Sequence, residues 1–409
     1  MAKKQKKFKP KEVPTKHQLS RWQREKRIQR IIISVAAVFL VGVISYVGYS
    51  HYNNDVKPLH EIVIEVNDIS FNMGYYVKML DAQTRTVCAL SKAFTSAQVR
   101  TYIEDAELMK QGANDLGIVV TTQEIDKEIE EGNELPNEKV YRDMVGAKLL
   151  GGKLWDYFDS QLPDKMEQAR IQVMLVDGQN VANNMTAAIQ SGGNFTALAN
   201  DFSCNSKIQG DLGWLPEELM PSPLIWIVAS SLEPGNVSSP TYDSSATKDV
   251  GYWLIEVTEK DEEKGIKARA ILLGSRAEAD EVKTKLGSGN FTSLAEEHSQ
   301  HESKDNGGEL GWLKQGDTGS DAFDRVAFEL PLNEVSEPVK DESVQTKGGY
   351  WIVKVLDKGE HELSEEVKKG LSNNDFTQWF EEQRENNTIN NYLDEKKKSW
   401  AAERVLEGR

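Results

Sequence analysis

The sequence lacks the residues that most redox, metal and nucleotide chemistry requires. Among 409 residues there are only two cysteines, Cys88 and Cys204, so a disulfide framework is excluded. No C-x-x-C, H-E-x-x-H or G-x-x-x-x-G-K-S/T motif occurs, and the six histidines show no metal-ligand spacing. The sequence therefore predicts no metal ion and no other cofactor.

Charge is absent from residues 31–50, although residues 1–30 contain twelve Lys or Arg and two Glu. Twenty apolar residues at about 1.5 Å per residue span about 30 Å, the thickness of the hydrocarbon layer of a bilayer. The alternative is a cleaved signal peptide, whose apolar region is usually about 7–15 residues and ends in a small-residue cleavage site. The pattern favours an uncleaved transmembrane helix at residues 31–50.

The charge distribution predicts an orientation for such a helix. The basic segment 1–30 is expected in the cytoplasm, and the C-terminal bulk of the chain outside it, anchored to the lipid bilayer by a single span. The net charge of the whole chain is −16, and because the first thirty residues carry +10, the remainder carries −26. That acidity disfavours nucleic acid as a partner of the exported part.

Part of the sequence is present twice. Residues 210–215 (GDLGWL) return as 308–313 (GELGWL), and residues 251–257 (GYWLIEV) return as 349–355 (GYWIVKV), in both cases 98 positions later. An earlier pair that begins with Asn194 and Asn290 is 96 positions apart, so one loop is shorter in the first copy. The period exceeds the roughly 20–50 residues of a solenoid repeat and is the size of a small domain. It indicates a duplicated domain.

The remaining patterns divide the chain into segments of an α+β protein. A short strand is expected at residues 61–66. Apolar residues spaced three and four apart from Ile103 to Leu116 predict a helix that Gly117 can end. Thr121 with Glu124 is a capping box that opens the next helix. After the span we expect a tether at 51–60, a mainly helical region at 61–165, repeats at 166–262 and 263–360, each a small antiparallel sheet flanked by helices, and a C-terminal helical segment at 361–409.

The repeated unit resembles the parvulin (PpiC-type) family of peptidyl-prolyl isomerases. The second repeat carries the ordered motifs GNFTSLA, NGGELGW, AFEL, EVSEPV and GYWIVKV at residues 289–295, 306–312, 327–330, 334–339 and 349–355. Residues 64–68 and 116–121 resemble the N-terminal region of the extracytoplasmic foldases SurA and PrsA. The resemblance implies a foldase whose partners are unfolded or proline-containing exported polypeptides.

The polar catalytic residues of the family are mostly absent from both repeats. Parvulins place two histidines and a Cys or Asp beneath an apolar pocket. The resemblance puts Val173 and Ala270 at the first histidine position, and Trp253 and Trp351 at the second. The Cys or Asp position is His301 in the second repeat and lies near Cys204 in the first.

The apolar pocket is better preserved in the second repeat. The pocket phenylalanine is Phe323, whereas the first repeat has Ile225 there. The resemblance implies a catalytic role for His301 alone. It implies substrate-binding roles for Phe323, Leu310, Thr346 and Trp351.

Three functions remain open on the sequence. Isomerisation has a barrier of about 18–20 kcal/mol, which a catalyst lowers by holding the proline in an apolar pocket and stabilising the twisted amide. The first hypothesis is a membrane-anchored extracytoplasmic foldase that isomerises prolyl bonds through the second repeat. The second is a chaperone that binds unfolded chains through degenerate parvulin domains without catalysis. The third is a structural partner of a membrane assembly.

Overall fold

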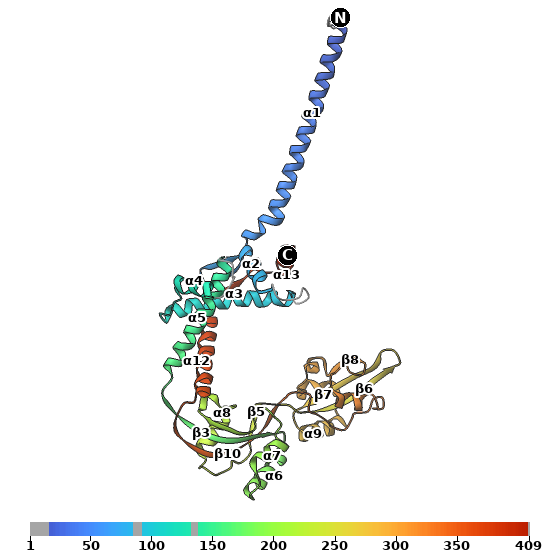
Figure 1. Ribbon diagram of the computed structural model, residues 1–409. Coiled ribbons are helices and arrows are strands. Elements are labelled where there is room, and N and C mark those ends of the chain that lie inside the picture. Colours follow the sequence, from blue (N-terminus) through green and yellow to red (C-terminus); the bar gives the residue numbers. More distant parts are fainter. Residues whose placement is uncertain (1–15, 85–91, 132–137, 408–409) are drawn as a thin grey trace, which may run out of the picture. The chain divides into compact units, whose positions relative to one another are not determined.

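The structure, a computed structural model, describes residues 16–84, 92–131 and 138–407 (Figure 1). The chain forms two compact units, the first made of Met1–Asp156 with Thr377–Arg409 and the second of Tyr157–Phe376. Because both ends of the chain belong to the first unit, the second unit is an insertion in its sequence.

The first described element is a single helix, α1 (Lys16–His51), followed by a π-helical turn, η1 (Tyr52–Val56), and a 3-10 turn, η2 (Pro58–His60). In the part of the chain that the structure describes, no helix is both long and apolar enough to cross a membrane. This finding contradicts the transmembrane helix expected at residues 31–50. The uncharged run is the second half of a longer helix whose first half carries Lys and Arg side chains.

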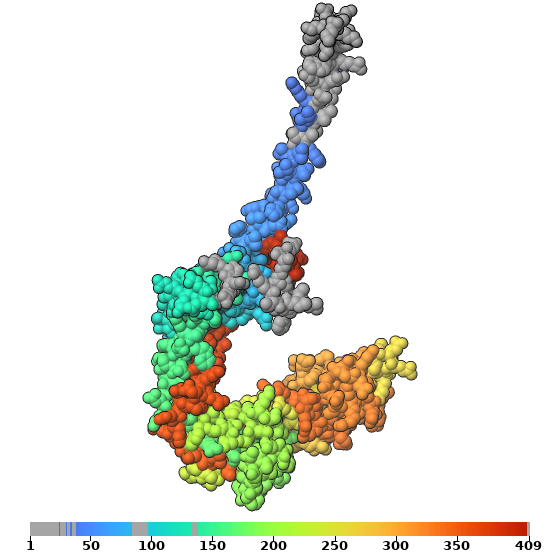
Figure 2. Space-filling view, viewed as in Figure 1, coloured from blue at the N-terminus to red at the C-terminus, as the bar shows by residue number. Residues whose placement is uncertain are grey.

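The first unit combines a three-stranded antiparallel sheet with helices. The sheet has the order β11-β1-β2, so a strand near the C-terminus pairs with the strand expected at residues 61–66. Val63, Tyr76, Leu393 and Val405 lie in one buried core, and the space-filling view shows C-terminal residues in red against N-terminal ones in blue (Figure 2). Its elements are β1 (Ile62–Val66), β2 (Ile69–Asn72), α2 (Met73–Thr84), α3 (Lys92–Asp115), α4 (Thr122–Glu131), β11 (Ile389–Asn391) and α13 (Glu395–Glu407). The boundary with the second unit falls within two further helices, α5 (Lys139–Gln161) and α12 (Glu365–Asn386).

The expected helix signals in this unit are confirmed. Helix α3 ends at Asp115, and Gly117 follows with a φ of 74°, the left-handed conformation in which glycine commonly ends a helix. At the start of α4, the side chain of Glu124 accepts a hydrogen bond from the backbone N–H of Thr121 (2.7 Å). In return, Thr121 Oγ1 accepts one from the backbone N–H of Glu124 (3.3 Å).

The second unit contains the two repeats, which have the same order of main elements. Each repeat has a first strand, two helices, a second strand, a third helix and two more strands. In the first repeat these are β3 (Lys165–Val176), α6 (Gln179–Gln190), α7 (Phe195–Phe202), β4 (Gly210–Leu215), α8 (Pro223–Ser231), β5 (Thr241–Lys248) and β6 (Gly251–Asp261). In the second they are β7 (Gly265–Leu273), α9 (Arg276–Leu286), α10 (Phe291–His298), β8 (Glu309–Leu313), α11 (Asp321–Ala327), β9 (Val339–Asp341) and β10 (Thr346–Glu362).

The two repeats exchange their last strands. One four-stranded antiparallel sheet has the order β4-β3-β10-β5, and the other has the order β8-β7-β6-β9. In Figure 1, β10 accordingly lies with β3 and β5, whereas β6 lies with β7 and β8. The registers are equivalent, because Trp351 of β10 lies opposite Leu175 of β3, and Trp253 of β6 lies opposite Leu272 of β7. Each sheet is thus completed by a strand from the other repeat.

Helices cover both faces of each exchanged sheet. Met174 and Val176 of β3 pack with residues of α6 and α7, whereas Val173 and Leu175 on the opposite face pack with Ile225 of α8. The second sheet repeats this alternation with α9 and α10 on one face and α11 on the other. With three small antiparallel sheets and helices, the architecture agrees with the predicted α+β class.

Candidate functional site

An aromatic cluster in the second unit contains two of the site residues that the sequence led us to expect. Phe323 lies on α11, where its backbone N–H donates to Ser320 Oγ at 3.0 Å. Its ring meets the indole of Trp253 edge-on, with centroids 5.4 Å apart, and the His301 ring lies 5.3 Å from the same indole. His301 and Phe323, both expected in the site, are therefore brought together. The tryptophan between them is Trp253 of the first repeat, whereas the sequence led us to expect Trp351.

The indole of Trp253 is held by a buried carboxylate. Trp253 Nε1 donates to Asp341 Oδ2 at 2.9 Å, and Ser320 Oγ donates to the same oxygen at 2.5 Å. Burial favours the neutral acid, but hydrogen bonds from Ser320, Ser343 and Trp253 outweigh burial and lower the pKa of Asp341. Asp341 is therefore ionised near neutral pH and is surrounded by donors.

The first repeat contains the same network around Trp351. Trp351 Nε1 donates to Asp243 Oδ2 at 3.0 Å, and Ser222 Oγ donates to that oxygen at 2.6 Å. Burial opposes ionisation here too, but the hydrogen bonds from Ser222, Ser245 and Trp351 lower the pKa of Asp243 to about 2. The sequence analysis missed both aspartates. The signal was available, because Asp243 and Asp341 are separated by the same 98 positions as the two tryptophans.

His301 caps a short helical turn. Its Nδ1 accepts a hydrogen bond from the backbone N–H of Ser303 (3.2 Å) and lies 2.9 Å from Ser303 Oγ, at the start of a 3-10 turn, η5 (Glu302–Asn306). Burial lowers the pKa of His301, although the charge of Glu302 opposes the shift. The imidazole is therefore neutral at pH 7, and its Nδ1 is already used by the turn.

The other expected site residues have different surroundings. Leu310 is half-buried and packs against the core that contains Trp253 and Phe323. Thr346 is buried outside that core, and its hydroxyl donates to the carbonyl oxygen of Val250. Trp351 is buried in the sheet of the first repeat, with 3 % of its surface exposed. Of the four expected binding residues, Phe323 and Leu310 thus share the core around Trp253.

The residues that could carry nucleophilic or metal chemistry do not form a site in the described structure. Burial raises the pKa of the Cys204 thiol to about 11, so the reactive thiolate is scarce at neutral pH. Cys88 lies outside the described residues. Among the residues that the structure describes, no three His, Cys, Asp or Glu side chains are grouped to hold a metal ion.

A groove of about 560 Å³ opens in the first unit. One wall is β2, the outer strand of its sheet, and the other walls are α3, α4, α5 and the loop before α4. Half of the 22 lining residues have apolar side chains: Ile69, Phe71, Met79, Ile103, Ala106, Ile118, Val119, Val120, Ile125, Ala147 and Leu150. Its volume lies within the roughly 300–1,000 Å³ of ligand pockets.

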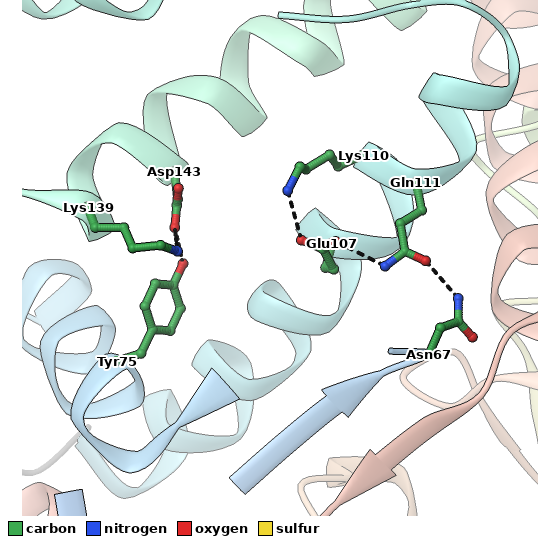
Figure 3. Close-up of polar contacts among 7 residues, drawn as sticks. All are labelled: Asn67, Tyr75, Glu107, Lys110, Gln111, Lys139 and Asp143. Carbon is green, nitrogen blue, oxygen red and sulfur yellow. Dashed lines mark hydrogen bonds and ion pairs between the residues drawn. The ribbon is translucent and has the colours of Figure 1, made fainter. Parts of the chain in front are cut away.

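The polar side chains at the groove satisfy one another. Tyr75 and Lys139 both donate to Asp143 Oδ2, each at 2.8 Å (Figure 3). On α3, Lys110 contacts Glu107 at 3.4 Å. Burial, together with the neighbouring carboxylate, raises the pKa of Tyr75. Since these charges are paired, the groove offers an apolar surface with a compensated polar rim.

Comparison with known proteins identifies the repeats. Residues 162–259 and 260–357 each match the family model of the PPIC-type PPIase (rotamase) domain. Chaperone SurA of Chromohalobacter salexigens is 27% identical over 232 residues, which are 52% of this chain and 48% of that protein. Foldase protein PrsA of Geobacillus kaustophilus is 40% identical over 127 residues, which are 29% of this chain and 43% of that protein.

A solved structure of foldase protein PrsA from Streptococcus pneumoniae covers 83% of this chain and 90% of that chain, with 10% identity and a TM-score of 0.28. That score is too low to support an argument about the fold. The chain spans about half the length of the SurA chaperones that it matches. Residues 162–259 and 260–357 are two PPIC-type PPIase domains in tandem, in a chain related to SurA chaperones and PrsA foldases.

Proposed function

We propose that this protein is an extracytoplasmic foldase that assists exported polypeptides chiefly by binding their unfolded segments. The likeness to SurA and PrsA supports the client class and the location outside the cytoplasm. The residues around Trp253 and Trp351 support binding rather than isomerisation as the main activity.

The observation that carries the proposal is the pair of buried tryptophan–aspartate contacts. Trp253 and Trp351 stand at positions where the family has a histidine, and each indole donates to a carboxylate. An indole nitrogen is a donor only, and it cannot pass a proton on. The two indoles are 5% and 3% exposed, so they pack in the core rather than face an open pocket. The two buried indoles, which act only as hydrogen-bond donors, favour a non-catalytic function for both repeats.

The apolar groove of the first unit offers a place for a client segment. Ile69 and Val119 line it and are 43% and 54% exposed. Exposed apolar surface of this kind is typical of sites that bind other chains. The outer strand β2 beside it can also pair with an extended peptide.

Isomerisation by the second repeat is the second candidate. It rests on His301 and Phe323, which lie on either side of Trp253. Asp341 beside Trp253 is ionised near neutral pH, so any turnover that depends on proton donation should depend on His301. The first repeat lacks the histidines and the pocket phenylalanine of the family, so we expect no turnover from it. Robust isomerisation by the first repeat would contradict that expectation.

Two assays on the full chain test the proposal. We expect suppression of the aggregation of an unfolded client, with little acceleration of prolyl isomerisation in a proline peptide. His301→Ala should remove whatever isomerisation remains and leave the suppression intact. A turnover comparable to that of an active parvulin, unaffected by His301→Ala, would overturn the proposal.

A matched pair of variants tests the groove. Val119→Asp adds a charge to the exposed apolar wall and should weaken aggregation suppression several-fold. Leu406→Asp makes the same change at a residue that is 50% exposed and is not part of the groove lining, and it should have no effect. Equal behaviour of the two variants would show that clients bind elsewhere.

A further inference from the structure

One short connection explains much of the strand pairing in the second unit. Strand β6 ends at Asp261 and β7 begins at Gly265, so three residues join the last strand of one repeat to the first strand of the next. Asp261 Oδ1 accepts hydrogen bonds from the backbone N–H groups of Glu263 and Lys264, both at 2.9 Å. Three residues reach at most about 11 Å. Such a connection suits a hairpin between adjacent strands and hardly reaches between two separate sheets.

The glycine that begins β7 supports the same conclusion. Gly265 has a φ of 93°, in the left-handed region. A Cβ atom there would collide with the carbonyl oxygen of Leu313 on β8. The turn is therefore fitted to the place where β7 meets both β6 and β8.

One charge pair distinguishes the observed pairing from its alternative. Glu256 of β6 lies opposite Arg269 of β7, with Oε2 and Nε 2.6 Å apart and side chains 11% and 24% exposed. The repeat places Lys354 at the position of Glu256, 98 residues later. If each repeat kept its own last strand, Lys354 would lie opposite Arg269. Directly opposed like charges destabilise a sheet, so the alternative is disfavoured.

The two segments that pass between the sheets also contact each other. The Thr346 hydroxyl donates to the carbonyl oxygen of Val250. The Lys248 side chain is buried, and its Nζ donates to the carbonyl oxygens of Lys347 (3.0 Å) and Gly348. Residues 248–250 and 346–348 thus form a packed crossing with satisfied polar groups.

We propose that the two parvulin-like sites are interlocked, each positioned by the tryptophan of the other repeat. Trp253 serves the site of His301 and Phe323, and Trp351 serves the corresponding site of the first repeat. The turn at residues 262–264 and the Glu256–Arg269 pair select this arrangement. Residues 251–341 then form a module nested between β5 and β10. The interlocked arrangement is the same whether the two sites bind unfolded chains or isomerise prolyl bonds.

The environment of His301 gives a direct test in the full chain. Histidine-labelled protein is observed by NMR, and the His301 signal among the six histidines is assigned with His301→Gln. Trp253→Phe should shift the His301 signal, because it removes an indole 5.3 Å away. The matched variant Trp351→Phe should leave that signal in place. A response to Trp351→Phe alone, or to neither variant, would overturn the proposal.

Cysteine cross-linking provides a second measurement that does not rely on altering the core. Asp357 of β10 lies opposite Arg170 of β3. If each repeat kept its own strand, Asp357 would instead lie opposite Lys267, which now faces Glu259. With Cys88 and Cys204 replaced by Ser, Asp357→Cys should cross-link within one chain to Arg170→Cys and not to Lys267→Cys. The reverse pattern would show that the repeats close separate sheets.

Discussion

At the scale of single residues, two tryptophans hold a buried hydrogen-bond network in each parvulin domain. Trp253 and Trp351 each donate to a buried aspartate, so the interior beneath each site is a fixed hydrogen-bond network. The donors keep Asp243 and Asp341 ionised, which leaves no proton for these carboxyl groups to give near neutral pH. The networks therefore act as structural supports, and their loss should be measured as lost stability.

Removing the carboxylate of one network tests this role. Asp341→Ala leaves the Trp253 indole N–H and the Ser320 hydroxyl without their acceptor. A buried polar group without a partner costs about 1–3 kcal/mol. We expect a decrease of about 2–4 kcal/mol in the free energy of unfolding, measured by urea denaturation. Asp341→Asn retains an acceptor oxygen and should cost less; equal losses would contradict the account.

The pKa of His301 predicts how stability depends on pH. Burial lowers the pKa in the folded state below about 6.5, the value expected in the unfolded chain. As the pH falls through about 6.5, the unfolded chain therefore binds a proton that the folded chain does not, and stability decreases. We expect His301→Gln to flatten the dependence of stability on pH below pH 7, measured by thermal unfolding. An unchanged slope would show that His301 titrates normally.

At the scale of elements, the exchange of β6 and β10 is the main feature of the second unit. The three-residue turn after Asp261 keeps β6 beside β7, and β10 fills the place that β6 leaves in the other sheet. The contact between Glu256 and Arg269 lies within this hairpin. The contribution of this pair to the free energy of unfolding can be compared with that of an exposed ion pair on the same two strands.

Two charge reversals on β6 make that comparison. Glu256→Lys places two cations at a pair whose side chains are 11% and 24% exposed, and should cost about 2–4 kcal/mol. Glu259→Lys does the same at the more exposed Glu259–Lys267 pair, and should cost only about 0.2–1 kcal/mol. Chemical denaturation of the two variants measures the difference. Equal costs would argue against the selective role of the Glu256–Arg269 pair.

At the scale of the whole molecule, the first unit depends on both ends of the chain. Strand β11 pairs with β1, and the side chains of Leu393, Ala401 and Val405 belong to the same core as Val63. A segment that the sequence marks only as charged and helical is therefore needed to complete the unit that contains the groove.

A buried and an exposed leucine near the C-terminus test this dependence. Leu393 is 6% exposed, and Leu393→Ala should destabilise the first unit by about 2–5 kcal/mol. Leu406 is 50% exposed, and Leu406→Ala should change stability by less than about 0.5 kcal/mol. Hydrogen exchange of the amides of β1 reports on this unit alone. Protection of β1 that survives Leu393→Ala would show that the C-terminal segment is dispensable.

The duplication, the α+β class and the parvulin relationship could all be predicted from the amino-acid sequence. These follow from local or ordered patterns, such as the 98-residue offset, the capping box at Thr121 and the motifs of the second repeat. The same local patterns predicted a transmembrane helix at residues 31–50, which the described structure contradicts.

The folded molecule was needed to show which tryptophan lies beside which aromatic cluster, and that the C-terminal segment completes the first unit. Both repeats end in nearly the same GYW strand, so either strand satisfies the hydrophobic pattern of either sheet. The choice depends on contacts between residues far apart in the sequence, such as Trp253 with Asp341 and Trp351 with Asp243. The repeat makes the sequences of β6 and β10 similar. The short turn between β6 and β7 and the charges opposite each strand determine which sheet each of them joins.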